Sequence, residues 1–478
     1  MSKSKPFIYR HILLDQLTPI AVYTIVKEMF PQEITFLFES GITNESGNTS
    51  FIAIGARERV WHKNSHSFYQ NETGDVAQID SNPLLFLKNY YHTVDYKAYQ
   101  EMTQEASIGF IDGFIGFVGY DMAREFEPVL QKTMAQLNDL YPNASEFDFI
   151  RPKMVLAYSH KTSRLTLAST MPEMEESLEK LVQAFHSPYT PRALQPAQNV
   201  QEGFFEFSKE RFFEMVEKSK EMIRSGDVFQ ILMSNRYIRK AVVDPLSFYR
   251  ILRTKNPSPY MYLLDFNHFA IAGSSPEVMV RLSNGQILLR PIAGTRKRGR
   301  DHKRDKELET EMLEDPKERS EHIMLVDLGR NDVGRVAKSG TVRVEALMRV
   351  ERYSHVMHMV SDVVADLDND KDMFDLFMAV FTAGTMTGAP KIRAMELIAQ
   401  FEGIKRGFYS GSIGYFGFDG NMDSAITIRS AYIDEEKIVC HAGAGVVADS
   451  QNELEYLEVQ NKLAATMSSL DDLVALES

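Results

Sequence analysis

RLSNGQILLR, at Arg281–Arg290, places Asn284-Gly285 between two short apolar runs. Asn-Gly is favoured at the centre of a tight β-turn because both residues tolerate a positive φ. The stretch therefore predicts an antiparallel hairpin. Asp419-Gly420 and Asp434-Glu435 also stand between apolar runs and predict two further hairpins.

Helical patterns alternate with these strand signals. Ser208 opens an amphipathic segment that stops at Gly226, and further helices are predicted at Pro390–Phe401, with Pro390 in the first turn, and at Asn452–Met467. An alternating pattern at Phe51–His62 predicts a strand. Because strands and helices mix without a steady βαβ order, the sequence predicts an α+β fold with largely antiparallel sheet.

One segment resembles a linker. HSPYTPRALQPAQNVQEG, at His186–Gly203, is rich in Pro and Gln and has no periodicity. The 478 residues also exceed one typical domain. We therefore expect an N-terminal region, residues 1–200, and a C-terminal domain, residues 204–478.

Composition excludes several classes of protein. The net charge of −13 argues against nucleic-acid binding, but not against a small anionic ligand. Cys440 is the only cysteine, so the chain has no internal disulfide and no multi-cysteine zinc site. No apolar run approaches the roughly 20 residues that cross a bilayer, and the N-terminus does not resemble a signal peptide. We expect a cytoplasmic protein without membrane contact.

Two acidic pairs could bind a metal ion. Glu318 and Glu321 are three residues apart, as are Glu455 and Glu458. On helices, each pair would project from one face. Two such faces meeting would offer the oxygen ligands that Mg²⁺ prefers, whereas two separate faces would be solvated surface.

Glycine-rich segments and histidines are further candidates. Arg290–Gly299, Phe381–Lys391 and His441–Asp449 could hold an anion on backbone N–H groups or form tight turns. None matches a nucleotide-binding motif. His355 and His358 could include a general base or be structural. Cys440 lies in a strand-like run, so covalent catalysis is not expected.

Taken in order, these segments resemble the chorismate-utilising enzymes. The resemblance covers nearly the whole chain and is carried by SSPEVMV, RPIAGTRKRG, EHIMLVDLGRND, SHVMHMVSDV, FTAGTMTGAPKIRAMELI, RGFYSGSIGYFG, AITIRSA and AGAGVVADSQNELEYLEVQNK. FLFESG near the start and NPSPYM at Asn256–Met261 are similar to anthranilate synthases within this family. The resemblance implies antiparallel sheets packed as a sandwich with surrounding helices.

The resemblance also implies a magnesium and substrate site. Glu321 and Glu458 would bind Mg²⁺ directly, and Glu318 and Glu455 would hold it through water. The ion would hold the ring carboxylate of chorismate. Tyr409 and Arg429 would hold the enolpyruvyl carboxylate. The rest of the implied substrate cradle consists of Gly294, Thr295, Gly443, Ala444 and Gly445.

The implied chemistry is amination followed by elimination. Ammonia attacks ring carbon 2 while the hydroxyl at carbon 4 departs, and Glu277 matches the general acid. His358 matches the histidine linked to loss of the carbon 2 proton and of pyruvate, and Gln230 and Thr385 complete the implied catalytic set. The product would be anthranilate, in the first step of tryptophan biosynthesis.

Two positions distinguish related activities. Water-adding relatives carry a lysine where this chain has Gln230, and aminodeoxychorismate synthases commonly carry one at Ala293. Neither side chain here can act as that base or nucleophile. Aminodeoxychorismate synthase and an inactive tryptophan sensor or scaffold remain the alternatives.

The resemblance implies regulation and a partner. A tryptophan-binding site that inhibits the enzyme would be lined by Glu39, Ser40, Pro259, Tyr260, Met261, Ile413, Gly414 and Tyr415. The chain has no cysteine nucleophile for glutamine hydrolysis, so we expect a glutamine amidotransferase subunit, in a heterotetramer, to supply ammonia.

Overall fold

The computed structural model describes residues 7–40, 49–135, 137–352 and 356–476. The strands of the first half are β1 (Ile8–Leu13), β2 (Thr35–Glu39), β3 (Thr49–Lys63), β4 (His66–Gln70), β5 (Val76–Ile79), β6 (Gly113–Val118), β7 (Phe147–Ser159), β8 (Arg164–Ser169) and β9 (Phe204–Phe205). Those of the second half are β10 (Gln230–Lys240), β11 (Tyr260–Asp265), β12 (Phe269–Ser275), β13 (Val278–Ser283), β14 (Gln286–Leu289), β15 (Ile292–Lys297), β16 (Arg343–Arg352), β17 (Val356–Asp366), β18 (Gly388–Ala389), β19 (Ser412–Gly417), β20 (Met422–Ile426), β21 (Ser430–Asp434) and β22 (Lys437–Val446).

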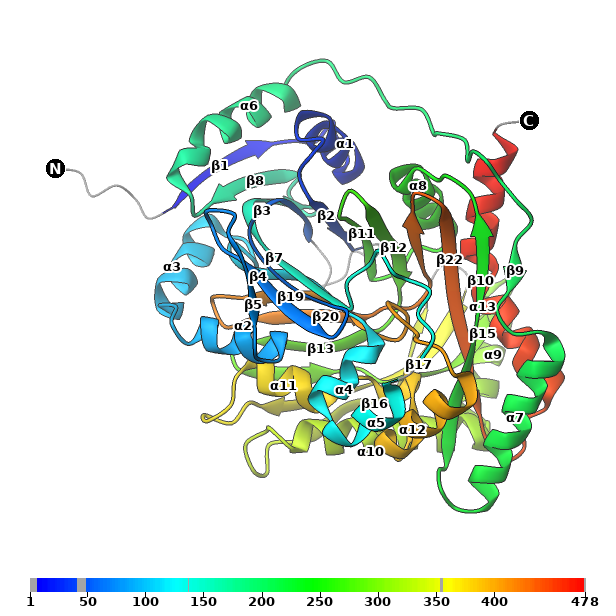
Figure 1. Ribbon diagram of the computed structural model, residues 1–478. Helices are drawn as coiled ribbons and strands as arrows, with labels where there is room; N and C mark the ends of the chain where they lie inside the picture. The colour runs from blue at the N-terminus through cyan, green and yellow to red at the C-terminus, as the bar shows by residue number, and fades with distance from the viewer. Residues whose placement is uncertain (1–6, 41–48, 136, 353–355, 477–478) are drawn as a thin grey trace.

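Helices surround these strands (Figure 1). The α-helices are α1 (Pro19–Met29), α2 (Pro83–Tyr91), α3 (Tyr96–Ala106), α4 (Ala123–Phe126), α5 (Gln131–Met134), α6 (Glu175–Phe185), α7 (Lys209–Arg224), α8 (Pro245–Lys255), α9 (His302–Glu314), α10 (Pro316–Gly334), α11 (Met373–Val380), α12 (Lys391–Glu402) and α13 (Asn452–Ala475). The 3₁₀ turns are η1 (Tyr120–Met122), η2 (Pro128–Leu130), η3 (Pro172–Met174) and η4 (Gly384–Met386).

The strands form two antiparallel layers. One layer runs in the order β1, β8, β7, β3, β2, β11, β12, β21, β22, β10. The other runs from β5 and β4 through β3, β7, β6, β19, β20, β13 and β14 to β17, which also pairs with β15 and β16. Each layer contains strands from both halves of the chain, and the predicted antiparallel α+β fold is confirmed.

The long strands β3 and β7 belong to both layers. Their pairing shifts register between Ala56 and Glu58, directly after Gly55, which has a φ of 71°. A side chain at this positive φ would be strained, so glycine suits the bend. A bend of this kind lets one strand pass from one sheet to the other.

The predicted local elements are confirmed with small differences. The turns at Asn284-Gly285, Asp419-Gly420 and Asp434-Glu435 connect β13 to β14, β19 to β20 and β21 to β22. Ser208 caps α7 by accepting a hydrogen bond from the Arg211 N–H. Pro390, expected in the first helical turn, instead takes the extended N-cap position of α12. The last helix, α13, continues past the predicted Met467 to Ala475.

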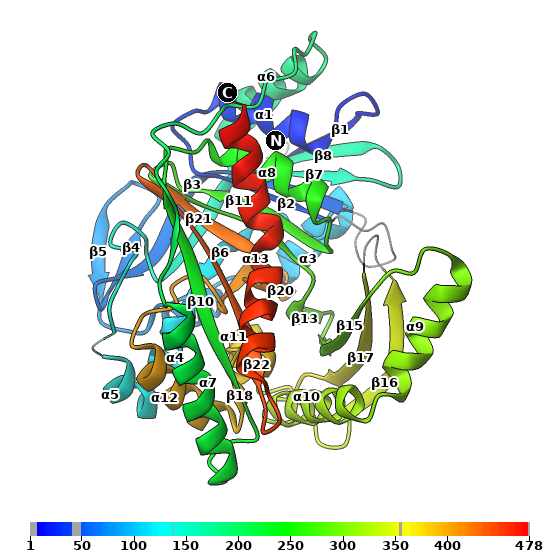
Figure 2. The same cartoon turned by 90° about the vertical axis from the view of Figure 1, so that its right-hand side faces the viewer.

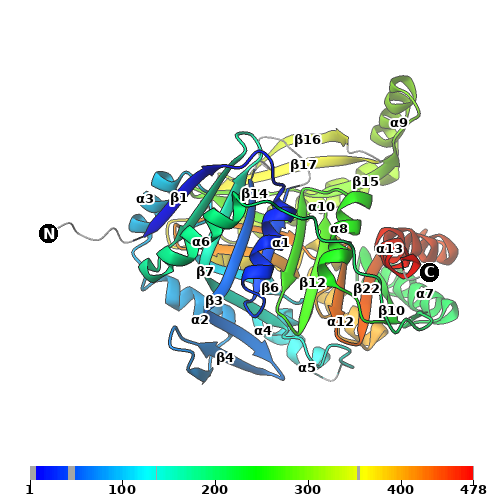
Figure 3. The ribbon, with the colours of Figure 1, turned by 90° about the horizontal axis from the view of Figure 1, so that it is seen from above.

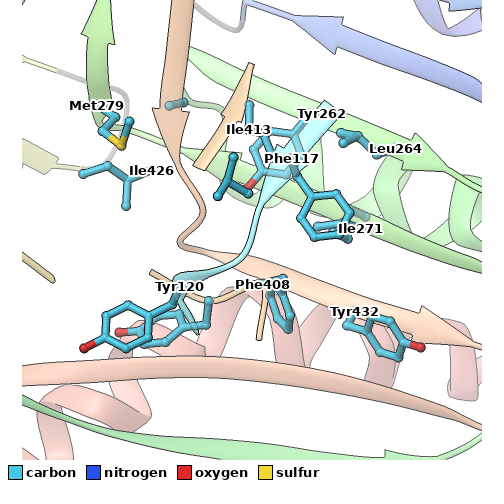
Figure 4. Close-up of a cluster of buried hydrophobic side chains, with 14 of the residues drawn as sticks. Phe117, Tyr120, Tyr262, Leu264, Ile271, Met279, Phe408, Ile413, Ile426 and Tyr432 are labelled. Atoms are coloured by element: carbon cyan, nitrogen blue, oxygen red, sulfur yellow. The ribbon is translucent and has the colours of Figure 1, made fainter. Parts of the chain in front are cut away.

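Both halves of the chain contribute to one large hydrophobic core. Figure 4 shows Phe117 of the first half beside Tyr262, Ile271 and Ile413 of the second, with Phe408 and Tyr432 across from them. The segment His186–Gly203 contains no helix or strand. It connects the two halves of the chain along the outside of the molecule (Figure 1).

Helices from the second half enclose one end of the layers. In Figure 2, α13 runs along β10 and β22, whereas β15, β17 and α9 stand apart on the opposite side with α10 beneath. Figure 3 shows the same separation from above, with α13 and α7 together and α9 projecting away. Among the described helices, none has the length and apolar character needed to span a bilayer.

Candidate active site

The four predicted metal carboxylates lie on two helices, as expected. Glu318 and Glu321 are on α10, and Glu455 and Glu458 are in the first turns of α13. Burial raises the pKa of Glu321, and the negative charges of Glu318 and Glu458 raise it further. Glu321 on α10 therefore lies within electrostatic range of Glu458 on α13.

Two of these carboxylates already form salt bridges with basic side chains of the protein. Arg296 Nη1 lies 2.7 Å from Glu318 Oε1, and Lys462 Nζ lies 2.7 Å from Glu458 Oε1. Within the described ranges, no three His, Cys, Asp or Glu side chains are close enough together to hold a metal ion. The repulsion felt by Glu321 nevertheless fits a cation at this place, and carboxylate oxygens are the ligands that Mg²⁺ prefers.

Glu277 is a buried carboxyl group between β12 and β13. Thr385 Oγ1, in η4, donates a hydrogen bond to Glu277 Oε1 at 2.8 Å. Burial raises the pKa of Glu277 to about 7, and the Thr385 bond and the charge of Lys462 only partly oppose it. This carboxyl group can therefore carry a proton near neutral pH.

A small cavity of about 30 Å³ adjoins Glu277 and Thr385. Leu325, Leu328 and Gly329 of α10 form another part of its wall. Apolar surroundings of this kind account for the burial that raises the Glu277 pKa.

His358 lies on β17, directly across from Thr295 of β15. His358 Nδ1 is 3.0 Å from Thr295 Oγ1 and 3.2 Å from the Gly294 carbonyl oxygen. Burial lowers the His358 pKa, and the charge of Arg429 acts in the same direction. The imidazole is therefore neutral at physiological pH, which suits a proton acceptor. His355, the other predicted histidine, lies outside the described residues.

Tyr409 and Arg429 lie near the part of β22 in which Gly443 and Gly445 have no side chains. A Cβ atom on Gly443 would lie 2.9 Å from the Tyr409 hydroxyl oxygen, and one on Gly445 would lie 2.5 Å from Gln230 Nε2. Arg429 donates from Nη1 to the Lys462 carbonyl oxygen at 3.0 Å. Ala444 is opposite Met233 in the register, so its side chain points to the other face and only its backbone can contribute.

Gln230 connects this strand to the acidic helices. Its Nε2 donates to Glu321 Oε1 at 3.3 Å. Its Oε1 is buried and has no hydrogen-bond partner among the described residues. An unpaired buried acceptor is costly, so this oxygen suits a small ligand that carries N–H groups.

The residues predicted to bind tryptophan line a separate, larger cavity of about 630 Å³. The structure brings all eight together there: Glu39, Ser40, Pro259, Tyr260, Met261, Ile413, Gly414 and Tyr415. Glu39 accepts hydrogen bonds from Tyr249 Oη at 2.6 Å and from Arg253 Nη2 at 3.0 Å. Its carboxylate is thus already held by two donors, which the sequence did not indicate.

Lys462 is a further site residue that sequence reasoning missed. Besides pairing with Glu458, its Nζ donates to the Gly443 carbonyl oxygen at 2.8 Å. Its position four residues after Glu458 on a predicted helix was the available signal. Cys440, by contrast, is fully buried and burial raises its pKa to about 12, which agrees with the expectation that it is no nucleophile.

Known proteins share both this sequence and this fold. Residues 35–468 match the family described as chorismate binding enzyme. Anthranilate synthase component 1 of Aquifex aeolicus is 39% identical over 487 residues, covering 97% of this chain and 94% of the relative. The crystal structure of anthranilate synthase component I from Streptococcus pneumoniae is 32% identical with a TM-score of 0.76, covering 95% of this chain and 99% of that one.

A more distant structure shares the fold alone. The menaquinone-specific isochorismate synthase of Escherichia coli has a TM-score of 0.73 at 18% identity, covering 97% of this chain and 94% of that one. The extent and identity of the nearer matches decide the assignment. The chain belongs to the chorismate-binding enzyme family and, within it, to the component 1 subunits of anthranilate synthase.

Proposed function

We propose that this chain catalyses the Mg²⁺-dependent amination of chorismate at ring carbon 2 with ammonia, followed by elimination of pyruvate to give anthranilate. The observation that carries this proposal is Glu277, a buried carboxyl group with a pKa raised to about 7. Hydroxide is a poor leaving group unless it is protonated. Glu277 can deliver that proton to the departing hydroxyl at carbon 4.

Tyr409 and Arg429 bind the enolpyruvyl carboxylate in this proposal. The phenol is buried and its pKa is raised by burial, so it stays a hydrogen-bond donor. The guanidinium of Arg429 supplies charge and further N–H donors. The missing side chains of Gly443 and Gly445 let the Tyr409 hydroxyl and the Gln230 amide come close to the β22 backbone.

The acidic residues of α10 and α13 hold the metal ion in this proposal. Glu321 and Glu458 would bind Mg²⁺ directly, and Glu318 and Glu455 would hold it through water. When bound, the ion neutralises the ring carboxylate and fixes the ring. Arg296 and Lys462 form ion pairs with Glu318 and Glu458.

His358 removes the carbon 2 proton as pyruvate leaves. A hydrogen bond from Nδ1–H to the Gly294 carbonyl oxygen selects the tautomer in which Nε2 is the basic nitrogen. Gln230 Oε1, buried and without a partner in the described structure, would accept an N–H of the attacking ammonia. Ala293 offers no nucleophile, which favours direct attack by ammonia over the lysine chemistry of aminodeoxychorismate synthases.

A glutamine amidotransferase supplies the ammonia in this proposal, because the relatives are named component 1 and this chain has only one cysteine. That cysteine is buried and its pKa is raised to about 12, so it cannot attack glutamine. We propose a heterotetramer of two such pairs. The N-terminal region, residues 1–200, would carry partner contacts as well as the Glu39 segment.

Tryptophan inhibits by binding in the 630 Å³ cavity in this proposal. Glu39 would accept a hydrogen bond from the amino group of tryptophan while it stays paired with Arg253. Val278 and Arg290 line both this cavity and the small cavity beside Glu277. An occupant of the larger cavity therefore presses on a wall shared with the proposed acid.

The direct test follows anthranilate fluorescence after mixing purified protein with chorismate, Mg²⁺ and ammonium. We expect fluorescence to appear, to vanish with EDTA and to fall with added tryptophan. Glutamine should replace ammonium only after the amidotransferase is added. Consumption of chorismate without anthranilate would favour aminodeoxychorismate synthase, and unchanged chorismate would favour an inactive sensor.

A further inference from the structure

A fully buried polar network lies behind Tyr409. The network contains His441, Ser234, Glu402 and Arg406, none of which touches the metal carboxylates. We propose that His441 is a positioning residue, which aims the Tyr409 hydroxyl at the substrate carboxylate. This inference rests on the proposed role of Tyr409 and adds the element that holds it in place.

The register of β22 puts His441 on the face that carries the cradle. Side chains alternate along a strand, so His441 points to the same side as Gly443 and Gly445. The two glycines leave space there, and Tyr409 enters it from the segment before β19. The imidazole of His441 stacks on the Tyr409 ring with centroids 4.1 Å apart and an interplanar angle of 22°. One face of the phenol is therefore fixed by a ring on the neighbouring strand.

A hydrogen-bond chain fixes the imidazole in turn. His441 Nε2 lies 2.9 Å from Ser234 Oγ, and Ser234 Oγ donates to Glu402 Oε1 at 2.8 Å. Because the serine proton goes to the carboxylate, His441 is the donor to Ser234. Burial lowers the His441 pKa well below its usual value, and the charges of Arg236 and Arg406 act in the same direction. The ring is therefore neutral, with its proton on Nε2.

Arg406 closes the network. It donates to Glu402 from Nε at 2.9 Å and from Nη2 at 2.6 Å, and both side chains are completely buried. The same guanidinium lies 5.8 Å from the Tyr409 ring centroid and 4.8 Å from that of Tyr120. The ion pair thus supports Tyr409 both directly and through Ser234 and His441. A buried network of hydrogen bonds and an ion pair of this kind holds a side chain in one orientation.

The orientation of the Tyr409 hydroxyl affects substrate binding. The Tyr409 hydroxyl oxygen lies 2.9 Å from the position that a Gly443 Cβ would take, so the phenol points along the cradle. Without the imidazole, the Tyr409 ring could rotate. Substrate binding would then have to fix the ring, and this loss of conformational entropy would weaken the affinity for chorismate. Loss of His441 should therefore weaken chorismate binding more than it slows the chemical step.

The test compares His441→Ala and His441→Gln with the unchanged enzyme, alone and combined with Tyr409→Phe. We expect each His441 variant to raise the KM for chorismate by about five- to tenfold, with kcat within about twofold. In the Tyr409→Phe background the same changes should raise KM no further, because the hydroxyl that His441 aims is gone. His441→Gln carries the same test if His441→Ala does not fold.

A second buried histidine provides the matched control. His62 is equally enclosed and also contacts a serine, with Nδ1 3.0 Å from Ser67 Oγ, but it lies in the β3–β4 hairpin away from Tyr409. His62→Gln should lower Tm without changing the KM for chorismate. The proposal is overturned if the His441 variants leave KM unchanged, or if their effect persists in full in the Tyr409→Phe background. If Tyr409→Phe itself leaves KM unchanged, the proposed carboxylate contact fails, and this inference fails with it.

Discussion

Glu277 and Glu39 are both buried glutamates, with 8% and 4% of their surface exposed, but their neighbours differ. Glu277 accepts one hydrogen bond from the neutral hydroxyl of Thr385. Glu39 accepts from the Tyr249 hydroxyl and from the guanidinium of Arg253. Burial without a directly bonded cation stabilises the protonated acid, whereas a bonded guanidinium stabilises the carboxylate.

The difference separates a chemical role from a binding role. A carboxyl group that keeps its proton near pH 7 can protonate a leaving group. A carboxylate that is paired with an arginine can also accept a hydrogen bond from an amine, as the proposed tryptophan site requires. In the proposed function, the same residue type has two roles beside one shared wall, which contains Val278 and Arg290.

The largest expected effect comes from Glu277→Gln. The amide keeps the size and the hydrogen bond from Thr385 but cannot donate a proton to the departing hydroxyl. We expect kcat for anthranilate formation to fall by about 10²- to 10⁴-fold in steady-state fluorescence assays. The matched change Glu39→Gln should leave kcat within about twofold. Equal losses in both variants would remove the functional distinction between the two glutamates.

The same variant should be more stable at alkaline pH. With its pKa raised to about 7 from an unfolded value of 4.5, Glu277 is ionised in the unfolded chain before it is ionised in the folded one. Its contribution is most favourable below pH 4.5 and is lost as the pH rises through 7. Glu277→Gln should therefore gain about 3 kcal/mol in unfolding free energy at pH 8.5 and nothing near pH 4. Urea titrations at both pH values measure this, and a gain independent of pH would contradict it.

Glu39→Gln should chiefly alter regulation. Replacing a charged acceptor by an amide removes a charge-assisted bond to the ligand amine. We expect the tryptophan concentration for half inhibition to rise by about ten- to a hundredfold. Isothermal titration with tryptophan should show the same loss of affinity. Unchanged inhibition would mean that Glu39 only stabilises the structure through its bonds to Arg253 and Tyr249 and does not bind tryptophan.

The smallest expected effect concerns Thr385→Val. The Thr385 hydrogen bond lowers the Glu277 pKa, so its removal should raise that pKa further. Because the acid must be protonated, kcat/KM at fixed free ammonia should decline above about pH 7 in the unchanged enzyme. In Thr385→Val the decline should start at higher pH, by about half a unit to one unit. A shift to lower pH would show that Thr385 does not act through Glu277.

Local features of the fold were predictable because their signals are local. Asn284-Gly285 gave its hairpin through the positive φ that both residues adopt, and Ser208 gave the start of α7 through its side-chain cap. The passage of β3 and β7 between two layers was not predictable from such signals. It depends on the pairing of β3 with β7, which are far apart in the sequence and adjacent only in the folded chain.

The candidate site likewise has features that the sequence predicted and features that it did not. The positions of Glu277, His358 and Glu321 were identified by resemblance, because they lie in distinctive motifs. Their environments were not, since Thr385 lies 108 residues from Glu277 and Arg253 lies 214 residues from Glu39. Lys462 was missed although it stands four residues after Glu458 on a predicted helix. His441 was missed because neither its residue type nor its spacing distinguishes it from an ordinary strand residue.

The most direct test of the contrast between the two glutamates is a pH titration by infrared difference spectroscopy, comparing the unchanged protein with Glu277→Gln and Glu39→Gln. We predict a carboxylic-acid carbonyl signal that disappears with a midpoint near pH 7, loses its Glu277 component in Glu277→Gln and keeps that component in Glu39→Gln. Burial also raises the pKa of Asp121 to about 7, so the signal that remains in Glu277→Gln is that of Asp121. A signal of unchanged size in Glu277→Gln, or a Glu277 already ionised at pH 5, would contradict the account.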